Sequence, residues 1–155
     1  MTEILGYAQA IAQRAGKAFL SGEVFAKVLT RNDDSGRHGL LVPSDAYAFF
    51  PHLEIPDSAL NTTGEFQAFD AVDGSWATVA YKYYERYPER RITRLNGILN
   101  DINNAPRLFV AIKAKHADGS IGYYFDCANT VAGGRFSHLF RLIFGSQVEP
   151  VSGRF

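Results

Sequence analysis

The sequence contains a single cysteine, Cys127, and no run of 18 consecutive apolar residues. One thiol cannot form an internal disulfide bond and cannot by itself hold zinc, so we expect a protein of the reducing cytoplasm. The lack of a long apolar run argues against a membrane-spanning helix. Near the N-terminus, Glu3 and Arg14 interrupt the apolar residues, so we expect no signal peptide.

Sequence patterns typical of catalytic centres are also missing. The stretch VAIK (110–113) matches the lysine strand of protein kinases, but no glycine-rich loop, HRD or DFG accompanies it. A metal-dependent nuclease needs clustered carboxylates, whereas the residue two before Lys113 is Ala111. The four histidines show no metal-ligand spacing. We therefore expect no cofactor, no metal and no catalytic centre in this chain alone.

The composition instead favours one β-rich domain. The chain has 155 residues, of which 46% are apolar, and it includes 12 Phe and 8 Tyr. This length suits a single domain over residues 1–155, and aromatic residues are enriched in strands.

Residue periodicity predicts strands with a helix near each end. Helices are expected at 2–20 and 134–145, and a short helix should begin at Ser44 as N-cap. Asp73-Gly74 and Asp118-Gly119 should form turns. Strands are expected at 23–30, 40–42, 65–72, 76–84, 105–117 and 120–128, and RITRL (91–95) is a further candidate extended segment. The strands do not alternate with helices, so we predict a mostly antiparallel, seven-stranded open β-pseudobarrel with flanking helices.

The charge is zero overall but strongly uneven along the chain. Residues 43–81 hold six acids and no Lys or Arg, whereas residues 82–115 hold eight Lys and Arg against three acids. A protein polarised in this way can present one positive face to a polyanion. Solvated loops of uneven charge are the plainer interpretation.

The basic segment at residues 82–96 combines arginines with an acid. In an extended chain Arg90, Ile92 and Arg94 share one face, and Glu89, Arg91 and Thr93 share the other. Arginine can bond guanine O6 and N7 together, and glutamate can accept from cytosine N4. The segment is therefore a candidate base reader; a salt bridge between Glu89 and Arg91 or Arg86 is the structural alternative.

A second polar loop, residues 31–39, carries Arg31, Arg37 and His38 beside small residues that allow close approach to a groove. Two polar arms on a β-barrel could clasp a duplex from both sides. Other polar side chains would contact the phosphate backbone, which positions DNA without specifying its sequence. These are Arg31, Lys82, Arg86, Asn96, Lys113 and Lys115.

Several motifs in a fixed order resemble the N-terminal DNA-recognition (effector) domain of EcoRII-type restriction endonucleases. VFAKVLTRNDDSGRHGLLVPS (24–44) resembles the family's first strand, polar arm and following G-L-x-[VI]-P-S. FFPHL (49–53), ERRITRL (89–95) and CAN (127–129) also have counterparts, and the family's E-K-R-I-T-R-W ends in an aromatic where this chain has Leu95. These pieces span about residues 20–145.

The resemblance implies a B3-like DNA-binding pseudobarrel from a restriction-modification system, with two arms that grip the major groove of a short site such as 5′-CCWGG. By the match, the first arm (residues 31–38) includes Arg37 and His38, near a base-reading histidine of the family. The second arm (residues 82–96) carries further predicted base readers, namely Glu89, Arg90, Arg91 and Arg94. In the family this domain is fused to a nuclease domain.

The sequence thus predicts a sequence-specific binder of double-stranded DNA. Two alternatives stay open: a small-ligand or enzymatic barrel with an aromatic pocket, and a binder of single strands or RNA. The latter would stack bases on tyrosines of the segment from Tyr81 to Tyr87.

Overall fold

Strands of the computed structural model form one curled sheet. The structure describes residues 2–29, 39–53, 61–71, 74–84, 89–94, 107–129 and 153–154. The helices are α1 (Thr2–Arg14) and the short 3-10 helix η3 (Ser44–Ala46). The strands are β1 (Phe19–Leu29), β2 (Leu40–Val42), β3 (Asn61–Asp70), β4 (Ser75–Tyr84), β5 (Glu89–Thr93), β6 (Arg107–His116), β7 (Ile121–Asn129) and β8 (Gly153–Arg154).

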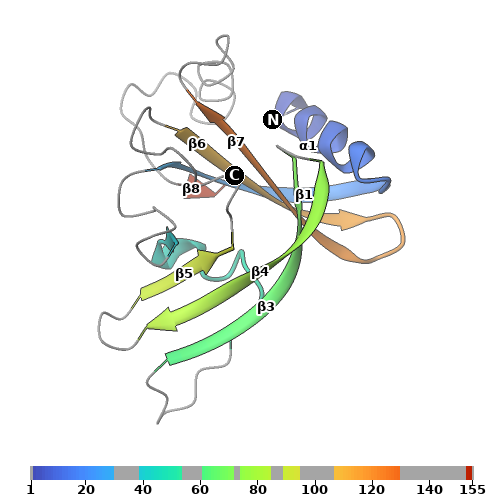
Figure 1. The fold of residues 1–155 in the computed structure, drawn as a ribbon. Helices are drawn as coiled ribbons and strands as arrows, with labels where there is room; N and C mark the ends of the chain where they lie inside the picture. The colour runs from blue at the N-terminus through green and yellow to red at the C-terminus, as the bar shows by residue number, and fades with distance from the viewer. Residues whose placement is uncertain are drawn as a thin grey trace.

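The strand order is β2-β5-β4-β3-β7-β6-β1-β8, and every neighbouring pair is antiparallel except β3 with β7. The parallel contact joins only residues 68–70 to residues 123–125. Beyond this short contact the two parts of the sheet diverge, which produces an open half-barrel (Figure 1). Among the described residues, seven strands have three or more residues, which agrees with the predicted seven-stranded pseudobarrel, and β8 adds two residues.

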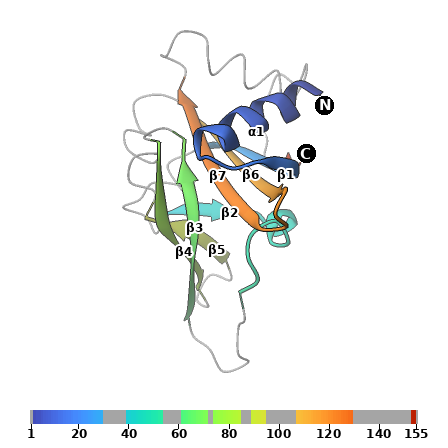
Figure 2. The same cartoon turned by 90° about the vertical axis from the view of Figure 1, so that its right-hand side faces the viewer.

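Strand alternation gives the sheet two apolar faces. On the inner face Phe109, Ala111 and Phe125 pack with residues of η3 and the chain that follows it. On the outer face Val110 and Ile112 pack beneath α1, which covers β1, β6 and β7 (Figure 2). Because both faces of β6 are buried, this strand is a nearly continuous apolar run up to Lys113.

Helix α1 is shorter than its apolar spacing predicts. It ends at Arg14 rather than at residue 20, because Gly16 adopts a positive φ of 74° and the amide of Lys17 returns to the carbonyl of Ala12. Phe19 and the residues after it are then free to join β1. Within the described residues, no helix is both long enough and apolar enough to cross a membrane.

Other predicted boundaries shift by a few residues. Strand β2 matches its prediction, whereas β3 begins at residue 61 instead of 65. The N-cap prediction at Ser44 is wrong, because η3 is capped by Pro43, which has no side-chain hydrogen-bond group. The predicted helix at 134–145 lies outside the described residues.

The predicted hairpin turn at Asp118-Gly119 is confirmed. Gly119 has φ 89°, and the amide of His116 donates to the carbonyl of Ser120 at 2.8 Å. The amide and hydroxyl of Ser120 both donate to the Asp118 carboxylate, and these bonds hold its pKa below the usual value. His116 is buried and bonds Ser120 Oγ through Nδ1 and the Tyr124 hydroxyl through Nε2. The turn and the strands beside it are thus tied together by polar side chains.

Two buried tyrosines predict loss of stability in alkali. Burial raises the pKa of Tyr124 to about 12, and burial followed by the nearby Glu23 raises the pKa of Tyr123 to about 12. An unfolded tyrosine loses its proton near pH ~10, so stability is complete below that pH and falls as pH rises towards ~12. We expect urea unfolding to show this fall, and Tyr124→Phe to make it shallower. An equal fall in the variant would contradict the assignment.

Candidate nucleic-acid interface

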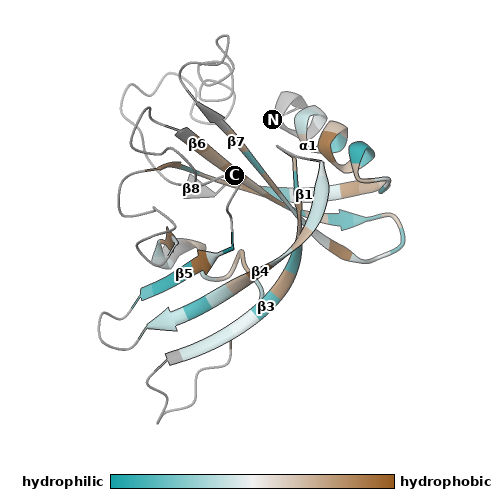
Figure 3. Cartoon of the chain, viewed as in Figure 1, coloured by the Kyte–Doolittle hydropathy of each residue, from teal (hydrophilic) through white to brown (hydrophobic). Residues whose placement is uncertain are grey.

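Most described residues of the second predicted arm belong to the sheet: residues 82–84 end β4, and residues 89–93 form β5. Strand β5 lies between β4 and β2, and Arg91 faces Lys82 on one side and Leu41 on the other. Hydrophilic residues gather along β5 and near the end of β4 (Figure 3). Because paired residues of antiparallel neighbours project to the same face, Lys82 and Arg91 lie on one face of the sheet.

Glu89 and Arg91 form a salt bridge on this face. Arg91 Nε lies 2.9 Å from Glu89 Oε1, and Arg91 Nη1 donates to the carbonyl of Gly39 at 2.8 Å. Arg91 is only 8% exposed, so its charge depends on these partners. The structural alternative predicted for Glu89 is therefore present, and the carboxylate is held in a defined position beside the first arm's exit.

Arg90 projects to the opposite face, as strand alternation predicts. Its guanidinium carbon lies 4.2 Å from the ring centre of Tyr47 and 5.8 Å from that of Tyr81. These distances are typical of cation–π contacts. Burial raises the pKa of the Tyr81 hydroxyl, and the neighbouring Arg90 charge partly offsets that effect. Arg90 therefore packs on the aromatic side of β5, away from Glu89 and Arg91.

Arg94 departs from the predicted alternation. Strand β5 ends at Thr93, and Arg94 has a positive φ of 66°. Its Nη1 reaches Glu65 Oε2 on β3 at 3.2 Å. Glu65 alternates with Phe66, which packs on the inner aromatic cluster, so Arg94 lies on the face opposite Arg90. The prediction that Arg90 and Arg94 share a face is wrong, because the left-handed turn redirects the chain.

The Arg94–Glu65 pair is open to solvent. The two side chains are 54% and 55% exposed. Exposed ion pairs of this kind add little to stability. The Arg94 guanidinium can therefore exchange its carboxylate partner for another acceptor at small cost.

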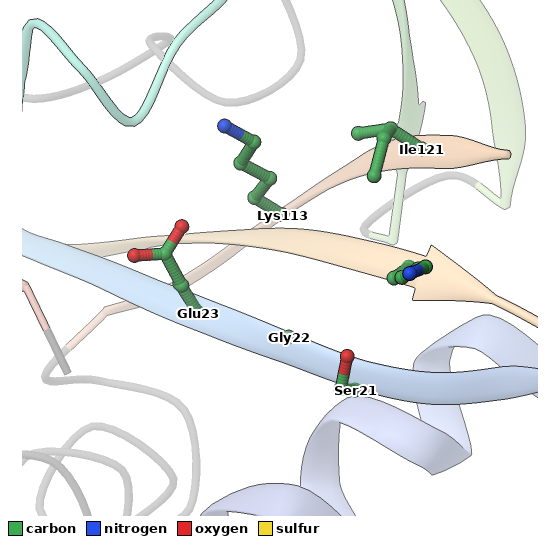
Figure 4. Close-up of a pocket in the computed structure, with 6 residues that line it drawn as sticks. Ser21, Gly22, Glu23, Lys113 and Ile121 are labelled. Carbon is green, nitrogen blue, oxygen red and sulfur yellow. The ribbon is translucent and has the colours of Figure 1, made fainter. Parts of the chain in front are cut away.

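Lys113 and Lys115 lie away from the other described candidates. They are on β6, four strand positions from β5 and three from β4, which carries Lys82. Figure 4 shows Lys113 beside Glu23, its partner across β1 and β6. Both lysines line a hollow of about 190 Å³ with Ile121. The structure thus separates these two predicted phosphate contacts from Lys82.

Five of the predicted DNA-contacting residues lie outside the described residues: Arg31, Arg37, His38, Arg86 and Asn96. The remaining seven are described, and Lys82, Glu89, Arg91 and Arg94 share the outer face of the β3-β4-β5 region. Among the described residues, no group of three or more His, Cys, Asp or Glu could hold a metal ion.

Two residues of this region were missed from the sequence. Gly39 supplies the carbonyl that Arg91 binds, and Tyr47 supplies the ring beneath Arg90. A glycine at the end of a polar loop is a usable signal, since glycine allows close backbone approach. No local signal identifies Tyr47, because its contact with Arg90 joins distant segments.

Comparison with known proteins places this fold in a family. No protein-family model and no curated protein matches the chain. A crystal structure of the B3 domain of the UbaLAI restriction endonuclease, solved with cognate DNA, is 53% identical to it. The match covers 99% of each chain with a TM-score of 0.89. This chain belongs to the restriction endonuclease B3 domains. The expected B3-type pseudobarrel is thereby confirmed, and the outer face just described is part of a B3 domain.

Proposed function

We propose that this B3 domain binds double-stranded DNA sequence-specifically, as the recognition domain of a restriction endonuclease. The observation that carries the proposal is the 53% identical B3 domain solved with its cognate DNA over 99% of both chains. The second arm supports it, because Lys82, Glu89 and Arg94 combine charge with hydrogen-bonding groups on one face.

In this proposal the site is short, of the 5′-CCWGG type, and both arms enter the major groove. Glu89 accepts from a base, and Arg94 leaves Glu65 to donate to one; the other proposed base readers are Arg37 and His38 of the first arm. Arg90 and Arg91 support the second arm from within, through Tyr47 and through Glu89. Phosphate contacts come from Arg31, Lys82, Arg86, Asn96, Lys113 and Lys115. Hydrolysis of DNA is assigned to a nuclease domain fused to this one, so the B3 domain alone binds without cutting.

The contacts seen in the structure favour this function over both alternatives. Among the described residues, the inner face is packed with aromatic rings, such as Phe49 and Phe50 at a centroid distance of 5.0 Å. Tyr81 is 2% exposed and Tyr83 packs against the same cluster. Tyr81 and Tyr83 therefore pack in or against the core and are not available to stack on unpaired bases.

A gel-shift comparison tests the function directly. Labelled CCWGG duplex, scrambled duplex of equal length and the single strand would be titrated with the protein. We expect the cognate duplex to bind most tightly and to stay uncut when Mg²⁺ is added. Preference for the single strand would contradict the proposal, and cleavage would contradict the assignment of hydrolysis to another domain.

Glu89→Gln tests the reading role of the acid. The amide has lost the charge and one acceptor oxygen, so discrimination between cognate and base-substituted duplexes should fall by about 1–3 kcal/mol. Binding to scrambled duplex should tighten slightly, because one negative charge leaves the surface. Asp118→Asn is the matched control, since it removes one charge from the β6–β7 turn, and it should keep full discrimination. Unchanged discrimination in Glu89→Gln would refute the reading role.

A further inference from the structure

The buried guanidinium of Arg91 connects the two predicted arms. One bond from it ends on Gly39, the residue that directly follows the first arm, and another ends on Glu89, the first residue of β5. The two bonded positions are 50 residues apart in the sequence, as the difference between 89 and 39 shows. A single side chain therefore contacts the exit of one arm and the candidate base reader of the other.

The position of the Gly39 carbonyl, which accepts the bond from Arg91, is set by the close packing of the Gly39 backbone on β5. Gly39 has φ 96°, and a Cβ added there would lie 2.3 Å from the carbonyl oxygen of Ile92 and 2.9 Å from Thr93 Cγ2. Gly39 is therefore in direct contact with β5. Next to it, Lys27 Nζ donates to the carbonyl of Leu41 at 3.0 Å, which ties β2 to β1. The carbonyl that receives the Arg91 bond thus has a fixed position in the sheet.

The bond from Arg91 holds the Glu89 side chain in one orientation. The Glu89 side chain is 26% exposed, and a glutamate on a strand surface can adopt several rotamers. The bond from Arg91 Nε restricts those rotamers. It also orients the carboxylate as a hydrogen-bond acceptor.

We propose that Arg91 is a positioning residue that sets the orientation of Glu89 relative to the exit of the first arm, and thereby sets sequence specificity. The inference rests on the proposed function and assigns Arg91 a role different from direct base reading. Its Nε and Nη1 both donate within the protein, so a bidentate contact to guanine would break one of these buried bonds. Arg91 acts through Glu89 and Gly39.

The variant Arg91→Lys tests this role because it keeps the charge and removes the fork that reaches two acceptors. Dissociation constants would be measured for cognate duplex and for duplexes substituted at each base pair. We expect discrimination to fall roughly 5–150-fold, at the same base pairs that Glu89→Gln relaxes. Binding to scrambled duplex should stay within about twofold, since the net charge is kept.

The double variant distinguishes positioning from direct reading. If Arg91 acts through Glu89, Arg91→Lys combined with Glu89→Gln should lose no more discrimination than the more severe single variant. Additive losses at different base pairs would show an independent base contact and overturn the proposal. Retained specificity in Arg91→Lys would also overturn it. A wild-type protein that does not discriminate duplexes at all would refute the proposed function and this inference together.

Chemical labelling of arginines in the wild-type protein tests the same role if Arg91→Lys fails to fold. An arginine-specific dicarbonyl reagent, followed by peptide mass spectrometry, should modify Arg94 in the free protein and spare Arg91. Cognate duplex should then protect Arg94 and leave Arg91 unreactive as before. Arg91 that reacts in the free protein and becomes protected by DNA would be an exposed reader, and the positioning role would be wrong.

Discussion

Raising the salt concentration from ~50 to ~200 mM is expected to weaken binding of the B3 domain to duplex DNA by roughly 500-fold. Five of the proposed phosphate contacts are cations: Arg31, Lys82, Arg86, Lys113 and Lys115. Each cation that neutralises a phosphate releases condensed counterions, which contributes about −0.9 to the slope of log K against log salt. Five contacts give a slope of about −4.5, and a fourfold rise in salt then produces the stated loss.

Single substitutions show which cations contribute to that slope. Lys82→Ala should make the slope shallower by about 0.9 and weaken all duplexes alike, because phosphate contacts do not specify bases. Lys113→Ala tests in the same way whether the two lysines of β6, Lys113 and Lys115, contact phosphates. Lys17→Ala, outside both arms, serves as the control and should leave the slope unchanged. Binding that does not respond to salt would contradict the proposed phosphate contacts as a group.

Phe50→Ala is expected to lower the free energy of unfolding by about 3–5 kcal/mol. Phe50 is 2% exposed, and its ring centre lies between 5.0 and 6.5 Å from six other aromatic rings. Removing the ring deletes these contacts and leaves a cavity, since the strands around it cannot collapse fully. Urea denaturation followed by circular dichroism measures the loss.

The conservative variant Phe50→Leu is the control for this effect. It keeps most of the side-chain volume and should cost clearly less than Phe50→Ala. A loss below about 1 kcal/mol in Phe50→Ala would mean that the inner face is loosely packed. The result bears on DNA binding as well, because Ile92 of β5 belongs to the same core cluster as Phe50. Loosening this cluster should therefore disturb the strand that carries Glu89 and Arg91.

Local signals in the sequence predicted most of the elements. The apolar run of β6, the Asp118-Gly119 turn and the triplet of β2 were all located, because each depends on neighbouring residues. Strand alternation also placed Glu89 and Arg91 on one face of β5, and the structure confirms this. The same rule failed at Arg94, because a positive φ in a non-glycine residue has no reliable sequence signal.

Composition, periodicity and charge by themselves determined that the chain is β-rich and that a basic segment follows an acidic one. The resemblance to the effector domains of restriction endonucleases came from motifs in a fixed order. Only the tertiary structure decided that Arg91 is buried between Glu89 and the Gly39 carbonyl, that Arg90 lies over Tyr47, and that Lys113 is remote from Lys82. The physical reason is that strand order and burial depend on pairings between residues far apart in sequence. A charged residue on a strand can be solvated or buried with partners, and its partners are supplied by other strands.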